Sequence, residues 1–100
     1  MQDQISALSL QLAPILKSNG VVFAGLFGSH AKGTAHQKSD YDFLIEFSPH
    51  KKYTLFQLAG LKEELENVLQ RPVDVVTPNG LDHYIKQEVL NSVISFYDHR

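Results

Sequence analysis

The sequence has 100 residues, of which 43% are hydrophobic and 20% are charged, and its formal net charge is -2. This composition is typical of one folded domain and excludes a disordered or low-complexity segment. The slight negative charge argues against broad electrostatic binding of nucleic acid, and the absence of cysteine excludes disulfides and thiolate metal sites.

The longest apolar stretch, Val21 to Phe27, is far too short for a membrane-spanning helix, which needs about 20 apolar residues. The first residues also lack the basic and then apolar layout of a signal peptide. We therefore expect a cytoplasmic protein that does not contact membranes, folded as a single domain over residues 1–100.

In the first half of the chain, the spacing of apolar residues predicts an amphipathic helix from about Asp3 to Lys17. After a break at Ser18 to Gly20, the apolar stretch 21–27 is typical of a strand buried on both faces. One short helical turn is expected at residues 30–32, followed by a polar loop at residues 34–39.

In the second half, Asp40 to Phe47 alternates in polarity as a strand does. Thr54 followed by Gln57 matches a capping box, so a helix should begin there. That helix closes before Pro72, and a short strand from Val73 to Val76 follows. A final amphipathic helix is predicted to bury a stripe that consists of Leu81, Ile85, Val89, Val93 and Phe96.

This order of elements predicts the α+β class, in a two-layer arrangement. We expect a three-stranded mixed sheet, formed by residues 21–27, 40–47 and 73–76, packed with about four helices. Residues that could bind a ligand or take part in catalysis lie at the edges or ends of all three strands.

Acidic residues occur in two of these strands. Asp40 and Asp42 are two positions apart, so on an extended chain both side chains leave the same face. Two close carboxylates repel each other unless a cation offsets the repulsion, and oxygen ligands favour magnesium or manganese over zinc. Asp74, between Val73 and Val75, would be costly to bury alone, and the same metal site would offset that cost. A short edge strand would instead expose Asp74 to water.

Three carboxylates suffice for two metal ions when the phosphates of a nucleoside triphosphate supply further ligands. Two ions about 4 Å apart activate an attacking hydroxyl and stabilise the leaving oxygen of an in-line phosphoryl displacement. Asp74 is a candidate to accept the proton of the attacking hydroxyl.

A glycine and a serine follow the first strand. Gly28 and Ser29 lie where the strand turns into a helix, so backbone N–H groups there can bind phosphate. Lys32 is a candidate ligand of the outgoing diphosphate, and His30 lies between these positions. A glycine–serine pair or an Asp-x-Asp pair alone often marks only a turn. The combination of both pairs with a third acid on a later strand supports the hypothesis of a catalytic site. The histidines show no metal-ligand spacing and are expected at the surface: His30, His36, His50, His83 and His99.

Residues 28–47, GSHAKGTAHQKSDYDFLIEF, resemble the signature of the DNA polymerase beta nucleotidyltransferase superfamily. In that signature a glycine and a serine precede two aspartates, and a third acid follows on a later strand, as in PVDVV at residues 72–76. At this length the chain most resembles the minimal nucleotidyltransferases, which are usually paired with a HEPN-domain partner. The resemblance implies a nucleotidyltransferase-like palm in which Gly28 and Ser29 bind the triphosphate and the metal ligands are Asp40, Asp42 and Asp74. Lys32 stands where arginine is common.

The resemblance also implies a function: magnesium-dependent transfer of AMP from ATP to a tyrosine of a HEPN ribonuclease toxin, which would make the chain an antitoxin. A macromolecular acceptor agrees with the short chain, because a small free acceptor generally needs an enclosing pocket. Two alternatives stay open: an aminoglycoside-like small-molecule acceptor, and a non-catalytic module that neutralises a partner by covering it. The sequence does not indicate the base preference or the oligomeric state.

Overall fold

A computed structural model describes residues 2–28, 31, 33, 40–50 and 52–100. The predicted turn at residues 30–32 and the predicted loop at residues 34–39 fall largely outside these ranges. The elements follow in this order: α1 (Gln2–Ser18), β1 (Val21–Phe27), β2 (Tyr41–Phe47), α3 (Leu55–Leu69), β3 (Val73–Val76), the 3-10 helix η1 (Pro78–Gly80), α4 (His83–Ser92) and β4 (Ile94–Asp98).

The four described strands form one mixed sheet in the order β3-β2-β1-β4. β1 pairs antiparallel with both β2 and β4, whereas β2 and β3 are parallel. A parallel pair needs a crossover connection, and α3 is that connection. The α+β class and the three predicted strands are confirmed, and the sheet has one strand more than predicted.

The additional strand comes from the end of the last predicted helix. α4 stops at Ser92, and Val93 is extended, with φ -67° and ψ 139°. Ile94–Asp98 then pairs with β1, and Phe96 enters the core from a strand. The prediction that the helical stripe continues through Val93 and Phe96 was wrong. Their spacing also suits a helix, and only pairing with the distant β1 favours the extended chain.

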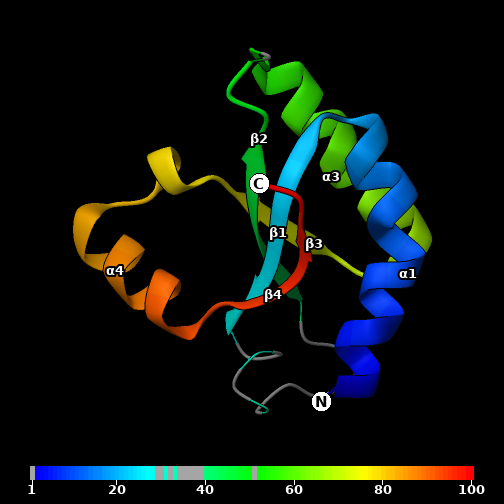
Figure 1. The fold of residues 1–100 in the computed structure, drawn as a ribbon, viewed down its shortest axis with the longest axis horizontal. Helices are drawn as coiled ribbons and strands as arrows, with labels where there is room; N and C mark the ends of the chain where they lie inside the picture. Colours follow the sequence, from blue (N-terminus) through cyan, green and yellow to red (C-terminus); the bar gives the residue numbers. More distant parts are fainter. Residues whose placement is uncertain (1, 29–30, 32, 34–39, 51) are drawn as a thin grey trace.

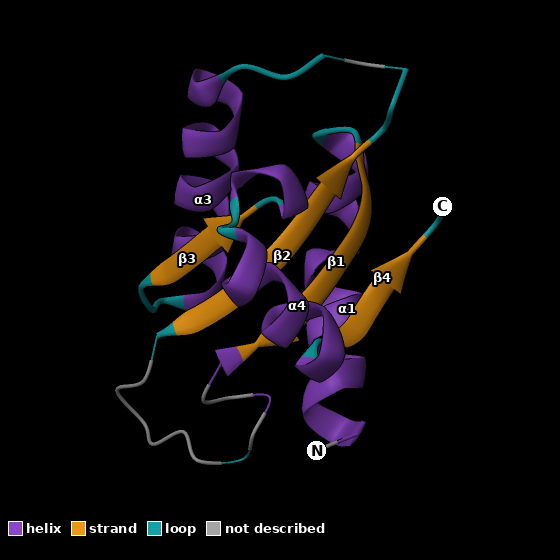
Figure 2. Cartoon of the chain, turned by 90° about the vertical axis from the view of Figure 1, so that its left-hand side faces the viewer, coloured by secondary structure: helices purple, strands orange, loops and turns teal. Residues whose placement is uncertain are grey.

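Helices lie on both faces of the sheet. In Figure 1, α1 and α3 are on the right of the sheet and α4 is on the left, and Figure 2 shows α4 in front with α1 and α3 behind. The larger core lies under α1 and α3 and includes Leu12, Phe43 and Leu65. A smaller cluster under α4 joins Phe23, Leu44 and Val89, and we call it the α4 cluster. Among the described helices, none combines the length and apolar character needed to span a membrane.

Helix α3 begins at the predicted capping box. The hydroxyl of Thr54 accepts a hydrogen bond from the Gln57 N–H at 3.2 Å, and the Gln57 side chain accepts one from the Thr54 N–H at 2.8 Å. The helix ends at Gln70, a C-cap in the left-handed conformation with φ 55°. These local signals delimit the helix as the sequence predicts.

Helix α4 is only partly covered by the sheet. Val89 is its buried residue, and Ile85, expected on the same buried stripe, is 53% exposed. Val93, just after the helix, lies so close over β1 that a Cβ at Gly25 would collide with its Cγ2 atom. Gly25 therefore allows the joint between α4 and β4 to sit directly on the sheet.

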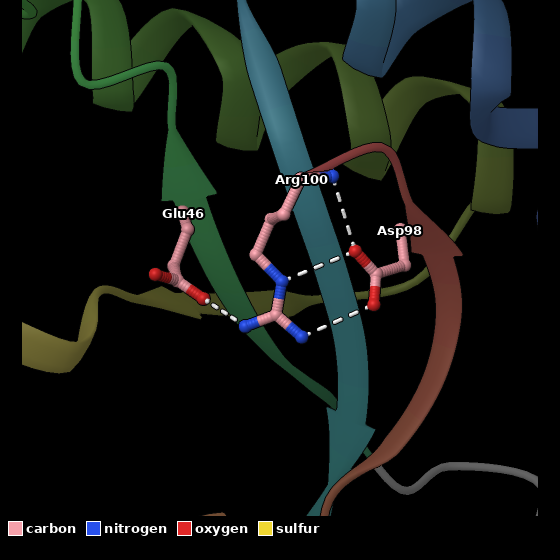
Figure 3. Close-up of polar contacts among 3 residues, drawn as sticks. All are labelled: Glu46, Asp98 and Arg100. Carbon is pink, nitrogen blue, oxygen red and sulfur yellow. Dashed lines mark hydrogen bonds and ion pairs between the residues drawn. The ribbon is translucent and has the colours of Figure 1, made fainter.

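Charged residues hold the end of the chain over the α4 face (Figure 3). The Arg100 guanidinium donates hydrogen bonds to both carboxylate oxygens of Asp98 at 3.1 Å and to Glu46 at 3.0 Å. The same guanidinium lies over the Phe23 ring, 4.3 Å from its centroid. The hydrogen bond from the Arg100 side chain lowers the pKa of Asp98, and the same bond raises the pKa of Arg100.

Candidate functional site

Asp42 lies on the face of the sheet that carries α4. Its neighbour in β2, Phe43, packs into the core under α1 and α3, whereas Leu44 belongs to the α4 cluster. Successive side chains of a strand point to opposite faces, so Asp42 shares the face of Leu44. Asp40 directly precedes β2 and is exposed.

Strand β3 brings Asp74 beside Asp42. In the parallel ladder these two residues are direct register partners. Val73 and Val75 pack into or against the core under α1 and α3, so Asp74 points to the opposite face, as Asp42 does. Neighbouring strands lie about 4.8 Å apart, so two acidic positions distant in sequence are adjacent in space.

The burial of Asp74 differs from the expectation. Asp74 is exposed, because within the described sheet β3 is an edge strand with a neighbour on one side only. The expectation of a costly buried charge was wrong, and no metal is needed to offset desolvation at this residue. Asp42, in the interior strand β2, is half-buried.

The three aspartates are brought to one region by the backbone, but their carboxylates do not form a ready-made metal cluster. Among the described residues, no group of three or more acidic, histidine or cysteine side chains is placed to hold a metal ion. Like charges repel, so separate orientations are favoured for carboxylates without a cation between them. The available donors are carboxylate oxygens, which fit magnesium or manganese by ligand type.

Gly28 contacts the region of the Asp42 carboxylate. Its φ is +74°, a left-handed conformation that favours glycine. A Cβ at this position would collide with the Oδ2 atom of Asp42. Phe27, just before it, is the register partner of Asp42 in the antiparallel ladder. The end of β1 therefore lies against the start of β2, and both the backbone angle and the space require glycine at position 28.

The other predicted phosphate ligands, Ser29 and Lys32, lie outside the described residues, as do His30 and His36. Their predicted contacts stay predictions. The remaining histidines are exposed, as expected: His50, His83 and His99.

One contact beside the site was not predicted from the sequence. The side chain of Glu66, on α3, accepts a hydrogen bond from the backbone N–H of Val73 at 3.0 Å, next to Asp74. Glu66 is one of several glutamates on α3, and no sequence motif distinguishes it from the others. The contact depends on how the turn after the helix folds back, which the sequence pattern does not show.

Comparison with known proteins connects this geometry to a family. A family model described as a nucleotidyltransferase domain matches residues 10–95. A candidate protein adenylyltransferase of Methanocaldococcus jannaschii is 39% identical over 90 residues, which cover 90% of this chain and 95% of that protein. The protein adenylyltransferase MntA of Thermococcus cleftensis is 36% identical over 94 residues, which cover 94% of this chain and 93% of that protein.

Solved structures share the fold. The structure of a candidate minimal nucleotidyltransferase has a TM-score of 0.76 and is 33% identical, with 92% of each chain covered. A chain from the complex of a tri-AMPylated Shewanella oneidensis HEPN toxin with an MNT antitoxin has a TM-score of 0.70. That chain is 18% identical, with 98% of this chain and 73% of that chain covered, so the likeness shows the fold alone.

Proposed function

Because the chain belongs to the nucleotidyltransferase family, we propose that it transfers AMP from ATP to a hydroxyl group of a partner protein, with magnesium as its cofactor. The observation that supports this proposal most directly is the register of Asp42 with Asp74 on the face of the sheet that carries α4. The proposed unit is one minimal nucleotidyltransferase domain over residues 1–100.

In the proposed reaction, the acceptor oxygen attacks the α-phosphorus of ATP, and the bond from that phosphorus to the bridging oxygen of diphosphate breaks. Asp40, Asp42 and Asp74 would hold magnesium. When bound, magnesium would supply a Lewis acid for the phosphate oxygens and a means to activate the acceptor hydroxyl. Asp74 is exposed and so can accept the proton of the attacking hydroxyl. The products are an AMP ester of the acceptor and diphosphate.

We assign the phosphates of ATP to the end of β1. Gly28 lies directly against the Asp42 carboxylate, and a Cβ at this position would collide with the Asp42 Oδ2 atom. The backbone after Gly28, with Ser29 and Lys32, would bind the triphosphate and the outgoing diphosphate. Together, these groups would hold ATP with its α-phosphorus toward the aspartates.

For the acceptor we propose a tyrosine hydroxyl of a HEPN-domain toxin, which would make this chain the antitoxin of a pair. The support comes from a related fold: in one solved complex, an MNT antitoxin is bound to a HEPN toxin that carries AMP groups. The named relatives at 36–39% identity are protein adenylyltransferases or candidates for that activity, which favours a protein acceptor.

The proposal is tested by incubating the chain with α-labelled ATP, magnesium and a co-expressed HEPN protein. We expect label on the partner. Asp42→Asn should reduce the rate by about 100-fold or more, since metal assistance is worth several kcal/mol and each ~1.4 kcal/mol is a factor of ten. Glu63→Gln, which neutralises an exposed acid on α3, is the matched control and should leave the rate unchanged.

Label transfer that survives Asp42→Asn would contradict the assignment of the site. Label on an aminoglycoside and not on the protein would show that the acceptor is a small molecule, while the proposed nucleotidyl transfer would stand. A stable complex without any label would show a non-catalytic binding module.

A further inference from the structure

Glu66 holds both ends of the turn that connects α3 to β3. Its backbone carbonyl accepts a hydrogen bond from the N–H of Gln70, the C-cap of the helix, at 2.8 Å. Its carboxylate oxygen Oε2 accepts one from the N–H of Val73, the first residue of β3, at 3.0 Å. Both donors belong to the backbone, so Glu66 is hydrogen-bonded to the C-cap of the helix and to the first residue of the strand.

The contact to Val73 satisfies a backbone group that needs a partner. Val73 is only 2% exposed, and a buried N–H without an acceptor is costly. Within the described sheet, β3 has a neighbouring strand on one side only, which is β2. The carbonyl of Pro72 accepts the N–H of Tyr41 at 3.1 Å on that side, whereas the N–H of Val73 goes to Glu66. The start of β3 is therefore bonded to β2 and to α3 at once.

The residue after Val73 is Asp74, whose place beside Asp42 depends on the register of β3. A shift of a strand by one residue turns each of its side chains to the other face of the sheet. A four-residue edge strand has few ladder hydrogen bonds of its own to resist such a shift. The hydrogen bond from the Val73 N–H to Glu66 restrains the first residue of β3 against such a shift.

We propose that Glu66 is a positioning residue that keeps Asp74 beside Asp42 for metal binding and catalysis. This role rests on the proposed function, because the position of Asp74 affects the reaction only if these aspartates hold the metal. Glu66 itself acts through the backbone of β3, since its side chain bonds to Val73 and not to a reacting group.

The test compares Glu66→Ala with Glu63→Ala, which removes the same type of side chain from an exposed position of the same helix. The first measurement is amide hydrogen exchange at Val73, which should become faster in Glu66→Ala alone. The second is a titration of each protein with Mn²⁺, followed by water proton relaxation. Loss of a group that orients a metal ligand typically weakens metal binding 10- to 100-fold, so the half-saturating Mn²⁺ concentration should rise about tenfold in Glu66→Ala.

Glu66→Gln keeps an oxygen acceptor at the same distance along the side chain and should restore most of the Mn²⁺ affinity. Glu66→Asp withdraws the acceptor by one methylene while keeping the charge, and should behave as Glu66→Ala does. Glu66→Asp also takes the place of Glu66→Ala if that variant does not fold.

Faster exchange at Val73 with an unchanged Mn²⁺ titration would overturn the positioning role, because the contact would then serve stability alone. Unchanged exchange at Val73 would overturn the contact itself. The outcome is separable from the proposed function. If the native chain binds Mn²⁺ through Asp42 but labels no acceptor, the proposed transfer fails, and a Glu66-dependent Mn²⁺ affinity still supports the positioning role.

Discussion

At position 28 the absence of a side chain leaves room for the Asp42 carboxylate at the end of β1. The left-handed backbone of Gly28 disfavours any other residue, and the Asp42 carboxylate occupies the space that a Cβ would take. A methyl group there would displace the Asp42 side chain, which lies on the face of the sheet that carries α4. The main consequence is then for the geometry of the site, and the consequence for the core is smaller.

Gly28→Ala should lower the rate of AMP transfer about 100-fold, since a misplacement of about 1 Å in a reacting constellation can have that effect. The left-handed alanine should also destabilise the fold by about 1 kcal/mol. The rate is measured with labelled ATP and the stability by urea denaturation. Gly60→Ala is the control, since an added Cβ there meets no described atom within 4 Å. A fully active Gly28→Ala would show that the Asp42 carboxylate can move without loss.

At the scale of elements, α3 links stability to the site because it packs the core and also anchors β3. Its residues Leu61 and Leu65 are fully buried. Glu66, on its last turn, accepts a hydrogen bond from the first residue of β3. The two ends of the helix have different tasks. The capping box at Thr54 stabilises the beginning of the helix, about 18 Å along the axis from Glu66 at 1.5 Å per residue.

Thr54→Ala should therefore lower the free energy of unfolding by about 1 kcal/mol, the usual effect of losing an N-cap. The half-saturating Mn²⁺ concentration should not change, because the turn at Glu66 is intact. Chemical denaturation and the Mn²⁺ titration measure the two quantities. Thr54→Ser keeps a hydroxyl acceptor and should retain most of the stability. A Thr54→Ala protein with weakened Mn²⁺ binding would indicate that the whole helix, and not its last turn, positions β3.

At the scale of the whole molecule, the face with the aspartates is covered by one short helix and by the end of the chain. Arg100 joins Asp98 of β4 to Glu46 of β2 across β1 (Figure 3). Its guanidinium also lies over the Phe23 ring. Arg100 and Asp98 are exposed and Glu46 is half-buried, so the ion pairs are screened by salt and contribute modestly to stability. The ion pairs link β2 to β4 near the end of the sheet where Phe47 and Val21 pair. The aspartates lie toward the opposite end of β2.

The Asp98 contacts predict a dependence of stability on pH. The pKa of Asp98 is lowered in the folded chain, so its stabilisation is present above the unfolded-state pKa of about 4 and is lost as the pH falls through the lower folded value. Arg100 stays protonated throughout this range. Urea denaturation should show the native chain more stable than Asp98→Asn at pH 7, and the difference should disappear in acid. A difference that persists unchanged at pH 3 would exclude Asp98 ionisation as its cause.

Much of the fold could be predicted because its signals are local. The helix at residues 2–18, the capping box at Thr54 and the strands at 21–27, 41–47 and 73–76 follow from apolar spacing and capping over a few residues. The strand β4 could not be predicted in the same way. Its residues suit a helix or a strand, and the choice depends on hydrogen bonds to β1, which lies some 70 positions earlier.

For the candidate site, the sequence by itself determined which chemical groups are present and the order in which they occur: a glycine after a buried strand and three aspartates at or next to strands. Only the tertiary structure decided that Asp42 and Asp74 are register partners, that Asp74 is exposed on an edge strand, and that Glu66 bonds to the start of that strand. The physical reason is that strand pairing and edge position are contacts between distant segments. Their free energy depends on the closed sheet as a whole and not on any local pattern of residues.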